Sequence, residues 1–285
     1  MKRSIYNGLL RWKQENYGHC AMVIDGVRRG RKVAILLMSF LLLMIGCGKE
    51  TTSGEEQTPP IDTMPVIPPV DTVPVIPPVD TVPVIEWIDL GLPSGLLWAT
   101  CNVGANAPEE NGGYYAWGET TTKAIYSWDT YLYSNGDYDK LTKYCSNAYY
   151  GYEGYTDTLT TLAACDDVAA AIWGDGARIP TKEEWQELLD YCSARWTHLH
   201  GEIGWLFYGS NGNTIFLPAV GFRFDDWDGN NGANGFYWSS SLNKQLPSSA
   251  YYYTFGCHGG SVETGRGRIE GYAIRPVRNV QPNSN

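Results

Sequence analysis

The chain has 285 residues, and its 31 acidic side chains outnumber its 21 lysines and arginines, which gives a formal net charge of −10. A chain with this charge cannot readily neutralise phosphates. We therefore expect no nucleic-acid partner and no binding to anionic lipid headgroups, and we attribute the acidity mostly to solubility.

The first segment, residues 1–46, has the features of an export signal. The apolar run from Val33 to Ile45 has 13 residues, whereas roughly 20 are needed to span a bilayer as a helix. It follows a basic flank and ends in Met-Ile-Gly before Cys47, which resembles the bacterial lipobox. We expect Cys47 to become the mature N-terminus and to carry diacylglycerol and palmitate. A short buried helix with an incidental cysteine is the alternative, and a start at Met22 would give the same mature protein.

Cleavage before Cys47 would remove 8 basic and 2 acidic residues, leaving 13 basic and 29 acidic residues and a net charge of −16. We expect the N-terminal lipid alone to hold the chain at a membrane. Lys49 and Glu50 mildly resemble surface-export signals, which favours an outer-membrane lipoprotein exposed at the cell surface. A lipoprotein that faces the periplasm is the alternative.

Residues 47–85 are predicted to form an extended stalk. Nine prolines fall between Pro59 and Pro83, and the sequence Pro-Val-Ile-Pro-Pro-Val-Asp-Thr-Val occurs twice in tandem. Proline fixes φ and lacks an amide donor, which favours polyproline II. Asp-Thr-aliphatic triplets resemble an O-glycosylation site of some Gram-negative gut bacteria, and they predict glycans on Thr63, Thr72 and Thr81. The alternative is that the triplets are only a product of tandem duplication.

The globular part is predicted at residues 86–279, which is enough for one domain with a full core, with a flexible tail at 280–285. Ten of the 11 tryptophans and 18 of the 20 tyrosines fall in it, together with many glycines and asparagines. This composition favours short strands joined by long, structured loops. We expect four tryptophans in the core: Trp98, Trp117, Trp185 and Trp238.

Two helices are predicted in the first half of the domain. One covers 162–173, where apolar residues recur at helical spacing and Gly174 can end the helix. The other covers 181–192, where Thr181 and Glu184 form a capping box ahead of an apolar face.

Strands are predicted from short apolar and aromatic runs at 86–90, 96–102, 114–117, 205–208, 214–217, 236–241, 251–255 and 272–277. Helices in the first half and strands crowded into the second predict an α+β fold. The tyrosine- and glycine-rich segment 144–155 is expected to be a loop.

Several motifs follow one another along the domain. They are Asp89-Leu-Gly-Leu-Pro-Ser-Gly-Leu-Leu-Trp-Ala99, Tyr115-Ala-Trp-Gly-Glu119, Arg178-Ile-Pro-Thr181, Glu184-Trp185, Ile215-Phe-Leu-Pro-Ala219, Tyr237-Trp-Ser-Ser-Ser241 and Arg275-Pro-Val277. In this order they resemble the Fibrobacter-type major paralogous domain, over nearly the whole domain. That family is similar to C-type lectin-like and formylglycine-generating-enzyme folds. The resemblance implies first and last strands that pair, and a ligand surface formed by loops in the second half.

The acidic loop from Asp225 to Gly232 has oxygen ligands at spacings that suit calcium, which takes six to eight oxygens. The candidate ligands are Asp226, Asp228 and Asn230. The loop is not an EF-hand, because the twelfth position from Asp226 is Tyr237, and residues 238–241 lack the sugar-calcium motif of true C-type lectins. A solvated acidic turn without any cofactor is the main expectation, with calcium as the alternative.

The loops are rich in tyrosine, serine, asparagine and glycine, a composition similar to that of antibody paratopes. We predict a ligand surface in 225–231 and 252–268, with contacts from Asp225, Trp227, Asp228, Asn230, Tyr252, His258, Arg266 and Arg268. Strand alternation separates Tyr252 from Tyr251 and Tyr253, and we expect Tyr252 on the outward face. Substituting both Trp227 and Arg268 in one variant is expected to abolish ligand binding without unfolding the domain. An aromatic core with ordinary loops is the alternative.

No catalytic group is predicted. Cys257 and His258 are adjacent, but neighbours on a strand point to opposite sides, so a thiolate-imidazole pair is not expected. His198 and His200 lack an evident third metal ligand, and capping and solvation explain the glutamates of the second helix. The domain has five cysteines, expected to be mostly buried thiols with at most one or two disulfides: Cys101, Cys145, Cys165, Cys192 and Cys257.

These features together predict a non-catalytic recognition domain that binds a glycan or protein ligand outside the cell. One alternative is a structural or accessory subunit of a cell-surface assembly. The other is an enzyme that retains the formylglycine-generating-enzyme-like fold, which would need a bound metal or a reactive thiol. The oligomeric state is left open.

Overall fold

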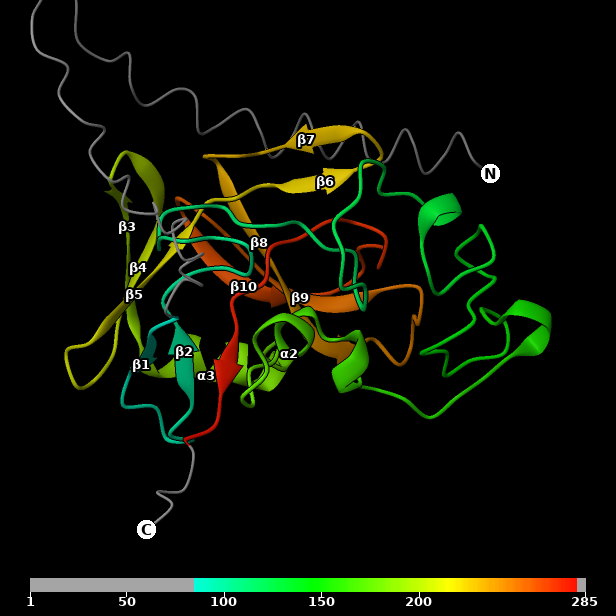
Figure 1. Cartoon of the computed structure of the whole chain (residues 1–285), viewed down its shortest axis with the longest axis horizontal. Helices are drawn as coiled ribbons and strands as arrows, with labels where there is room; N and C mark the ends of the chain where they lie inside the picture. Colours follow the sequence, from blue (N-terminus) through cyan, green and yellow to red (C-terminus); the bar gives the residue numbers. More distant parts are fainter. Residues whose placement is uncertain (1–84, 281–285) are drawn as a thin grey trace, which may run out of the picture. The chain divides into compact units, whose positions relative to one another are not determined.

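The computed structural model describes residues 85–280, all of which belong to one compact unit, Val82–Asn285 (Figure 1). The predicted signal peptide, the lipid on Cys47, the stalk and its threonines Thr63, Thr72 and Thr81 lie outside the described residues. The same holds for the predicted tail after residue 280, so these features stay predictions.

Residues 85–280 contain two α-helices and eleven strands, and the α+β prediction is confirmed. The helices are α2 (Val168–Trp173) and α3 (Lys182–Tyr191). The strands are β1 (Trp87–Asp89), β2 (Leu97–Ala99), β3 (Ser193–Leu199), β4 (Glu202–Tyr208), β5 (Thr214–Pro218), β6 (Phe222–Phe224), β7 (Trp227–Gly229), β8 (Asn234–Leu242), β9 (Ala250–Gly256), β10 (Gly259–Glu263) and β11 (Val277–Arg278). Within this range no helix is long and apolar enough to cross a membrane.

Strands β8, β9 and β10 form an antiparallel sheet with β9 in the middle. Strands β8 and β9 are buried on both faces, whereas β10 is largely exposed at the edge. Alternate side chains enter two different cores, because neighbours on a strand point to opposite sides. Tyr253 and Phe255 join one core together with Trp185 of α3. Tyr252 joins the other core, which includes Trp238 and residues of α2. The expectation that Tyr252 faces solvent is therefore wrong.

The first and last strands lie in the same sheet, on either side of β2. Figure 1 shows this sheet with β1 and β2 in cyan and β11 in red. The expectation that the first and last strands pair directly is wrong in this detail, because each of them pairs with β2. The arrangement still brings the two ends of the described chain to one sheet.

The second predicted helix is confirmed as α3. Thr181 accepts from the Glu184 amide, the Glu184 carboxylate accepts from the Thr181 amide, and Trp185 and Leu188 are buried. The first predicted helix is wrong in its start. A separate 3-10 turn, η4 (Ala164–Asp166), precedes α2, which begins only after Asp167. The Asp167 carboxylate caps α2 by accepting from the amides of Ala169 and Ala170.

The strand predicted at 114–117 is not found, and the strands predicted at 96–102 and 272–277 are too long. Segments 114–117 and 272–277 meet through one isolated bridge between Tyr115 and Tyr272, and only β11 is a strand in the second of them. Strands β3, β6, β7 and β10 are found where none was predicted. The sequence of β3 shows no clear alternation because this strand is largely exposed at the edge of the β3-β4-β5 sheet. The four core tryptophans are confirmed as buried.

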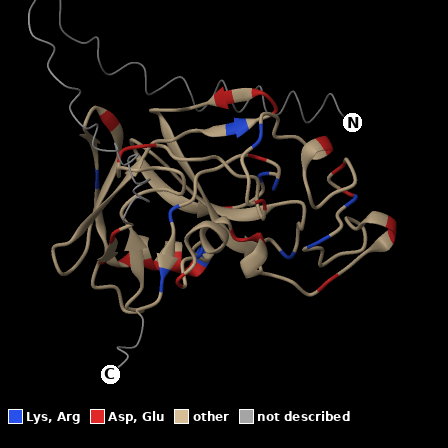
Figure 2. Cartoon of the chain, viewed as in Figure 1, with Lys and Arg blue, Asp and Glu red and all other residues tan. Residues whose placement is uncertain are grey.

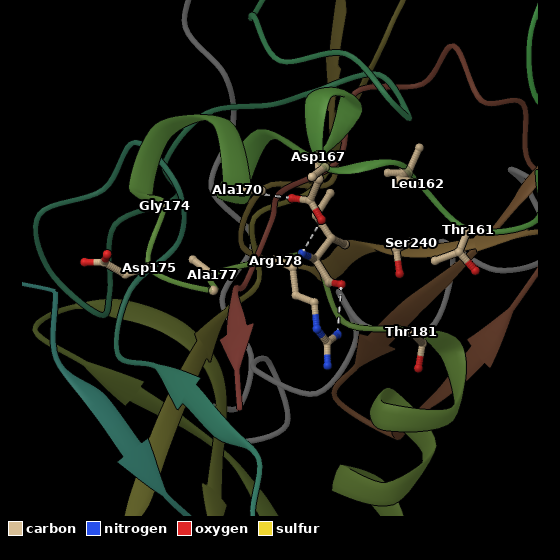
Figure 3. A pocket seen from close by; sticks show the side chains of 13 residues that line it. Thr161, Leu162, Asp167, Ala170, Gly174, Asp175, Ala177, Arg178, Thr181 and Ser240 are labelled. Carbon is tan, nitrogen blue, oxygen red and sulfur yellow. Dashed lines mark hydrogen bonds between the residues drawn. The ribbon is translucent and has the colours of Figure 1, made fainter. Parts of the chain in front are cut away.

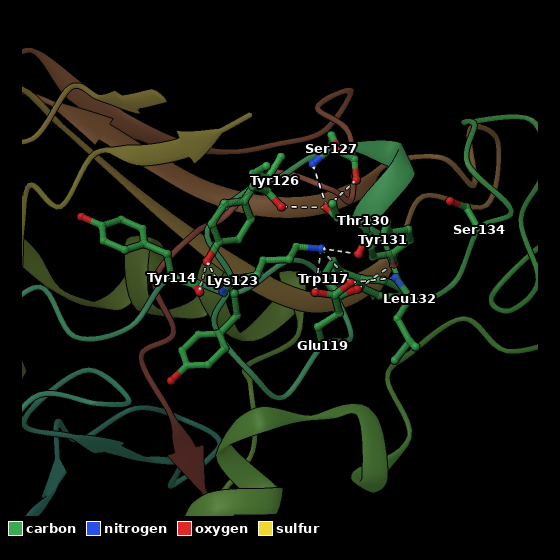
Figure 4. Close-up of polar contacts among 12 residues, drawn as sticks. Tyr114, Trp117, Glu119, Lys123, Tyr126, Ser127, Thr130, Tyr131, Leu132 and Ser134 are labelled. Atoms are coloured by element: carbon green, nitrogen blue, oxygen red, sulfur yellow. Dashed lines mark hydrogen bonds and ion pairs between the residues drawn. The ribbon is translucent and has the colours of Figure 1, made fainter. Parts of the chain in front are cut away.

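A long loop, residues 118–163, runs without a strand or an α-helix, as predicted for its 144–155 part. Buried side chains anchor it to the domain. Figure 4 shows its base, where the buried Glu119 carboxylate accepts from Lys123 Nζ at 2.9 Å and from the Leu132 amide at 2.8 Å. The Tyr131 hydroxyl donates to the Trp117 carbonyl at 2.7 Å. The loop is therefore an ordered part of the fold.

Candidate functional site

The predicted acidic loop is a two-stranded hairpin of β6 and β7. Its turn contains Asp225, which has a positive φ of 52°. The backbone of Asp225 exchanges two hydrogen bonds with Tyr126, at 2.9 and 3.0 Å. Tyr126 is itself buried. The end of the hairpin is therefore fixed to the body of the domain rather than free in solvent.

Trp227 is the large aromatic residue exposed on this hairpin, with 41% of its surface accessible. Its ring packs edge-on against Phe222, with centroids 5.3 Å apart. A Cβ atom on Gly229 would lie 2.3 Å from the indole, so the glycine leaves the space that the ring occupies. The guanidinium of Arg266 lies 5.3 Å from the same Phe222 ring. Trp227 and Arg266, which are distant in sequence, thus both lie against the buried Phe222 ring.

The acidic residues of the hairpin are exposed, and one of them is paired. The carboxylate of Asp228 on β7 lies 2.7 Å from Nη1 of Arg223 on β6. Figure 2 shows acidic positions in red and basic positions in blue on this pair of strands. Arg223 also lies 4.8 Å above the Tyr114 ring. A cation bound by Asp226, Asp228 and Asn230 would have to compete with Arg223. Among the described residues, no group of three or more His, Cys, Asp or Glu side chains is arranged to hold a metal ion.

Arg268 lies in the interior and not on the predicted ligand surface. It is fully buried, and its guanidinium donates to the carbonyls of Tyr144 and Lys143 at 3.0 and 3.2 Å. The group lies 5.3 Å from the rings of Trp117 and Tyr131. Burial lowers its pKa. The expected surface position of Arg268 is wrong, because the side chain joins the second half of the domain to the long loop.

The predicted ligand contacts fall into two groups, those at the surface and those in the core. His258 is exposed in the two-residue turn between β9 and β10, next to Cys257. Asn230 is half-buried just after β7 and has a positive φ of 65°. The structure therefore brings Asp225, Trp227, Asp228, Asn230 and Arg266 to one region around Phe222. Tyr252 and Arg268 are withdrawn into the core.

Four cysteines of the domain are free thiols: Cys101, Cys145, Cys165 and Cys192. Cys101 and Cys145 are buried, and burial raises the pKa of each thiol. Cys257 lies in a turn, so the strand argument against a pair with His258 does not apply to it. Of the two other histidines considered, His200 lies 2.7 Å from the Glu109 carboxylate, and His198 is exposed on β3.

A cavity of about 480 Å³ lies between α2, the 177–181 segment and β8 (Figure 3). Two of its three charged side chains, Asp167 and Arg178, already have partners, and the third is Asp175. The Asp167 carboxylate accepts from Ala169, Ala170 and Ile179 amides, and the Arg178 guanidinium pairs with both oxygens of Glu184. Leucine, alanine and isoleucine side chains form much of the wall. The cavity therefore offers shape and apolar contact rather than a reacting group.

The exposed tyrosines of the long loop were not among the ligand contacts predicted from the sequence. Tyr149 is 70% exposed and Tyr138 is 42% exposed, more than most aromatic residues of the domain. The signal for them was present in the tyrosine, glycine and asparagine content of 144–155. It did not show which rings would remain outside the core.

Comparisons with protein-family models, with curated proteins and with solved structures find no match to this chain. The resemblance of its motifs to the Fibrobacter-type major paralogous domain stays a prediction. The function must therefore be argued from the surface groups themselves.

Proposed function

We propose that the globular domain is a non-catalytic recognition module that binds a glycan or protein ligand outside the cell. The observation that supports this most strongly is Trp227, an indole exposed on a hairpin whose end is fixed by Tyr126. Leaving an indole in water forgoes the free energy of burying it. A rigid aromatic ring provides contact area at a low cost in conformational entropy, as in antibody paratopes.

The groups around Trp227 fit the pattern of an interaction site. Binding hot spots commonly consist of a central aromatic residue surrounded by polar groups that exclude water. Here Asp225 and Asp228 are exposed on the same hairpin, and Arg266 lies beside the Phe222 ring against which the indole packs. A ligand that stacks on the indole would meet hydrogen-bond acceptors and one cationic group. This supports binding of a polar ligand with an apolar face.

We also propose that the domain has a C-type lectin-like fold. Two features support this proposal. The first and last strands belong to one sheet, and the β6–β7 hairpin with Trp227 lies in the second half of the chain. The position of the hairpin agrees with what the motif resemblance implies for the ligand surface. The shared sheet comes near to the implied pairing of the first and last strands, although β2 lies between them.

We further propose that the chain is an outer-membrane lipoprotein displayed at the cell surface, held by its lipid on a stalk. The Met-Ile-Gly-Cys sequence at Cys47 supports the lipid, and the tandem proline repeat supports the stalk. Labelled palmitate should enter the full-length chain in its producing cell and should be lost with Cys47→Ala. Equal labelling of the two chains would contradict the lipid anchor.

The recognition proposal is tested by screening the compact unit Val82–Asn285 on arrays of glycans and host proteins, once with calcium and once with a chelator. Saturable binding to a narrow ligand class is the expected result. Loss of that binding in chelator would assign calcium to Asp226, Asp228 and Asn230. A blank array would contradict the proposal and would favour a structural subunit of a surface assembly.

A further inference from the structure

Three tyrosine rings form a cluster on the long loop, which we name the tyrosine cluster: Tyr138, Tyr149 and Tyr150. The rings of Tyr149 and Tyr150 meet edge-on at 5.0 Å, and those of Tyr138 and Tyr150 lie 6.4 Å apart. Tyr149 is the most exposed large apolar side chain of the described residues, at 70%. The cluster presents aromatic surface to solvent rather than completing a core.

Hydrogen bonds fix the backbone beneath the tyrosine cluster. The Leu141 amide donates to the Tyr150 carbonyl at 2.7 Å, which joins the Tyr138 turn to the Tyr149 turn. The Asn147 side chain accepts from the Tyr149 amide at 3.0 Å. A Cβ on Gly151 would lie 1.8 Å from the Tyr155 carbonyl oxygen, so only glycine fits there. The rings are therefore presented by an ordered backbone, which lowers the entropy cost of binding.

A side-chain atom next to the cluster lacks a partner. Oδ1 of Asp139 is shielded from solvent and has no hydrogen-bond partner. This oxygen is closed to a ligand as well as to water, so it is not itself a ligand contact. Tyr149, Asp139 and Asp137 lie close enough to the Tyr138 hydroxyl to raise its pKa. Hydrogen-bond acceptors thus lie beside exposed aromatic rings.

We propose that the tyrosine cluster binds a neutral oligosaccharide. A pyranose ring carries C–H groups on one face, which suit the negative face of an aromatic ring, and hydroxyl donors at its rim, which suit carboxylates. The surrounding charge selects against anionic sugars. The three acidic side chains Asp137, Asp139 and Glu153 outnumber the exposed Lys140, and the nearby Lys143 is already paired with Asp166.

This site consists of other residues than the Trp227 hairpin. Figure 1 draws most of the long loop in green at the end of the domain opposite β3, whereas β6 and β7 form a different edge. The loop meets the hairpin through backbone hydrogen bonds between Tyr126 and Asp225, and the variants below change neither of these residues. A loss of binding can therefore be assigned to one surface once the fold of each variant has been checked.

The test uses the compact unit Val82–Asn285 and titrates it, by calorimetry, with neutral oligosaccharides of glucose, mannose, galactose and xylose. Sulfated and uronic-acid oligosaccharides form the anionic arm. The variants are Tyr149→Ala, Tyr149→Phe and the matched control Tyr191→Ala, whose tyrosine is 58% exposed at the end of α3. Thermal unfolding of each variant checks that the fold is retained.

Saturable binding of at least one neutral oligosaccharide is expected. Tyr149→Ala should weaken it about tenfold or more, while Tyr149→Phe and Tyr191→Ala should stay within about twofold of wild type. The proposal is overturned if no neutral oligosaccharide binds, if only anionic sugars or protein probes bind, or if Tyr149→Ala binds as wild type does. Binding that is lost in Trp227→Ala but kept in Tyr149→Ala would uphold the recognition function and refute this site.

Discussion

The guanidinium of Arg268 donates from Nη1 to the carbonyl oxygen of Tyr144, 3.0 Å away and 124 positions earlier in the chain. A second bond, from Nη2 to the Lys143 carbonyl, lies beside it at 3.2 Å. The cation is buried, 5.3 Å from the rings of both Trp117 and Tyr131. Arg268 is therefore one of the anchors by which the C-terminal half of the domain holds the long loop, beside the backbone bonds between Tyr126 and Asp225.

Replacing this arginine should destabilise the domain. Arg268→Ala removes a charged donor from two carbonyls and leaves a cavity beside two aromatic rings, and we expect a loss of about 3 kcal/mol in the free energy of unfolding. Urea unfolding measures it, with Arg195→Ala on the exposed strand β3 as the control. A loss below about 1 kcal/mol would show that Arg268 does not anchor the loop. Because of this role, a Trp227 and Arg268 double variant cannot test binding alone.

Because of Asp166, the free energy of unfolding of the domain should decrease at low pH. Burial alone would raise its pKa, but hydrogen bonds from Lys143, Tyr144 and Tyr133 lower the pKa below its usual value. A carboxylate with a lowered folded-state pKa contributes stability at a pH above about 4, and this contribution is lost as the pH falls through the folded-state pKa.

Wild type should therefore be more stable than Asp166→Asn at pH 7, and the difference should shrink as the pH falls below about 4. Unfolding free energies at a series of pH values measure this. Asp175→Asn, at an exposed carboxylate, serves as the control and should show a difference near zero throughout. A gap between wild type and Asp166→Asn that stays constant with pH would refute the assigned hydrogen bonds.

The thiols should differ in their rate of alkylation. Cys165 is the exposed cysteine of the domain, whereas Cys101 and Cys145 are buried and burial raises their pKa. A short pulse of iodoacetamide should therefore label Cys165 first, because the thiolate is the reacting form and access is needed. Peptide mass spectrometry shows the order in which the cysteines are alkylated. The Cys165→Ser substitution should remove the fast phase of alkylation. Faster labelling of Cys257 would instead support the enzyme alternative.

Local patterns predicted the local structure well. The capping box of Thr181 and Glu184 was predictable because a capping box involves residues only three apart. The strands β8 and β9 were predictable from their aromatic content. The position of Tyr252 was not, because the sequence gives alternation but not the number of buried faces, and these two strands are buried on both.

The ligand surface was only partly predictable for a related reason. Trp227 could be predicted to lie at the surface because its neighbours in the sequence are acidic, and burying charged side chains is unfavourable. Arg268 was misplaced, since cations are rarely fully buried and its partners are backbone carbonyls that leave no mark in the sequence. The tyrosine cluster depends on positive φ values and on contacts between turns, which local composition does not specify.

The most direct measurement screens wild type, Trp227→Ala and Tyr191→Ala versions of Val82–Asn285 side by side on glycan and host-protein arrays. Trp227 is exposed, so its removal should leave the fold intact, and Tyr191 is an exposed aromatic residue on a different element. The recognition account predicts that wild type and Tyr191→Ala bind the same narrow ligand class, and that Trp227→Ala loses at least one ligand that they share. Identical profiles for all three proteins, or no binding by wild type, would contradict it.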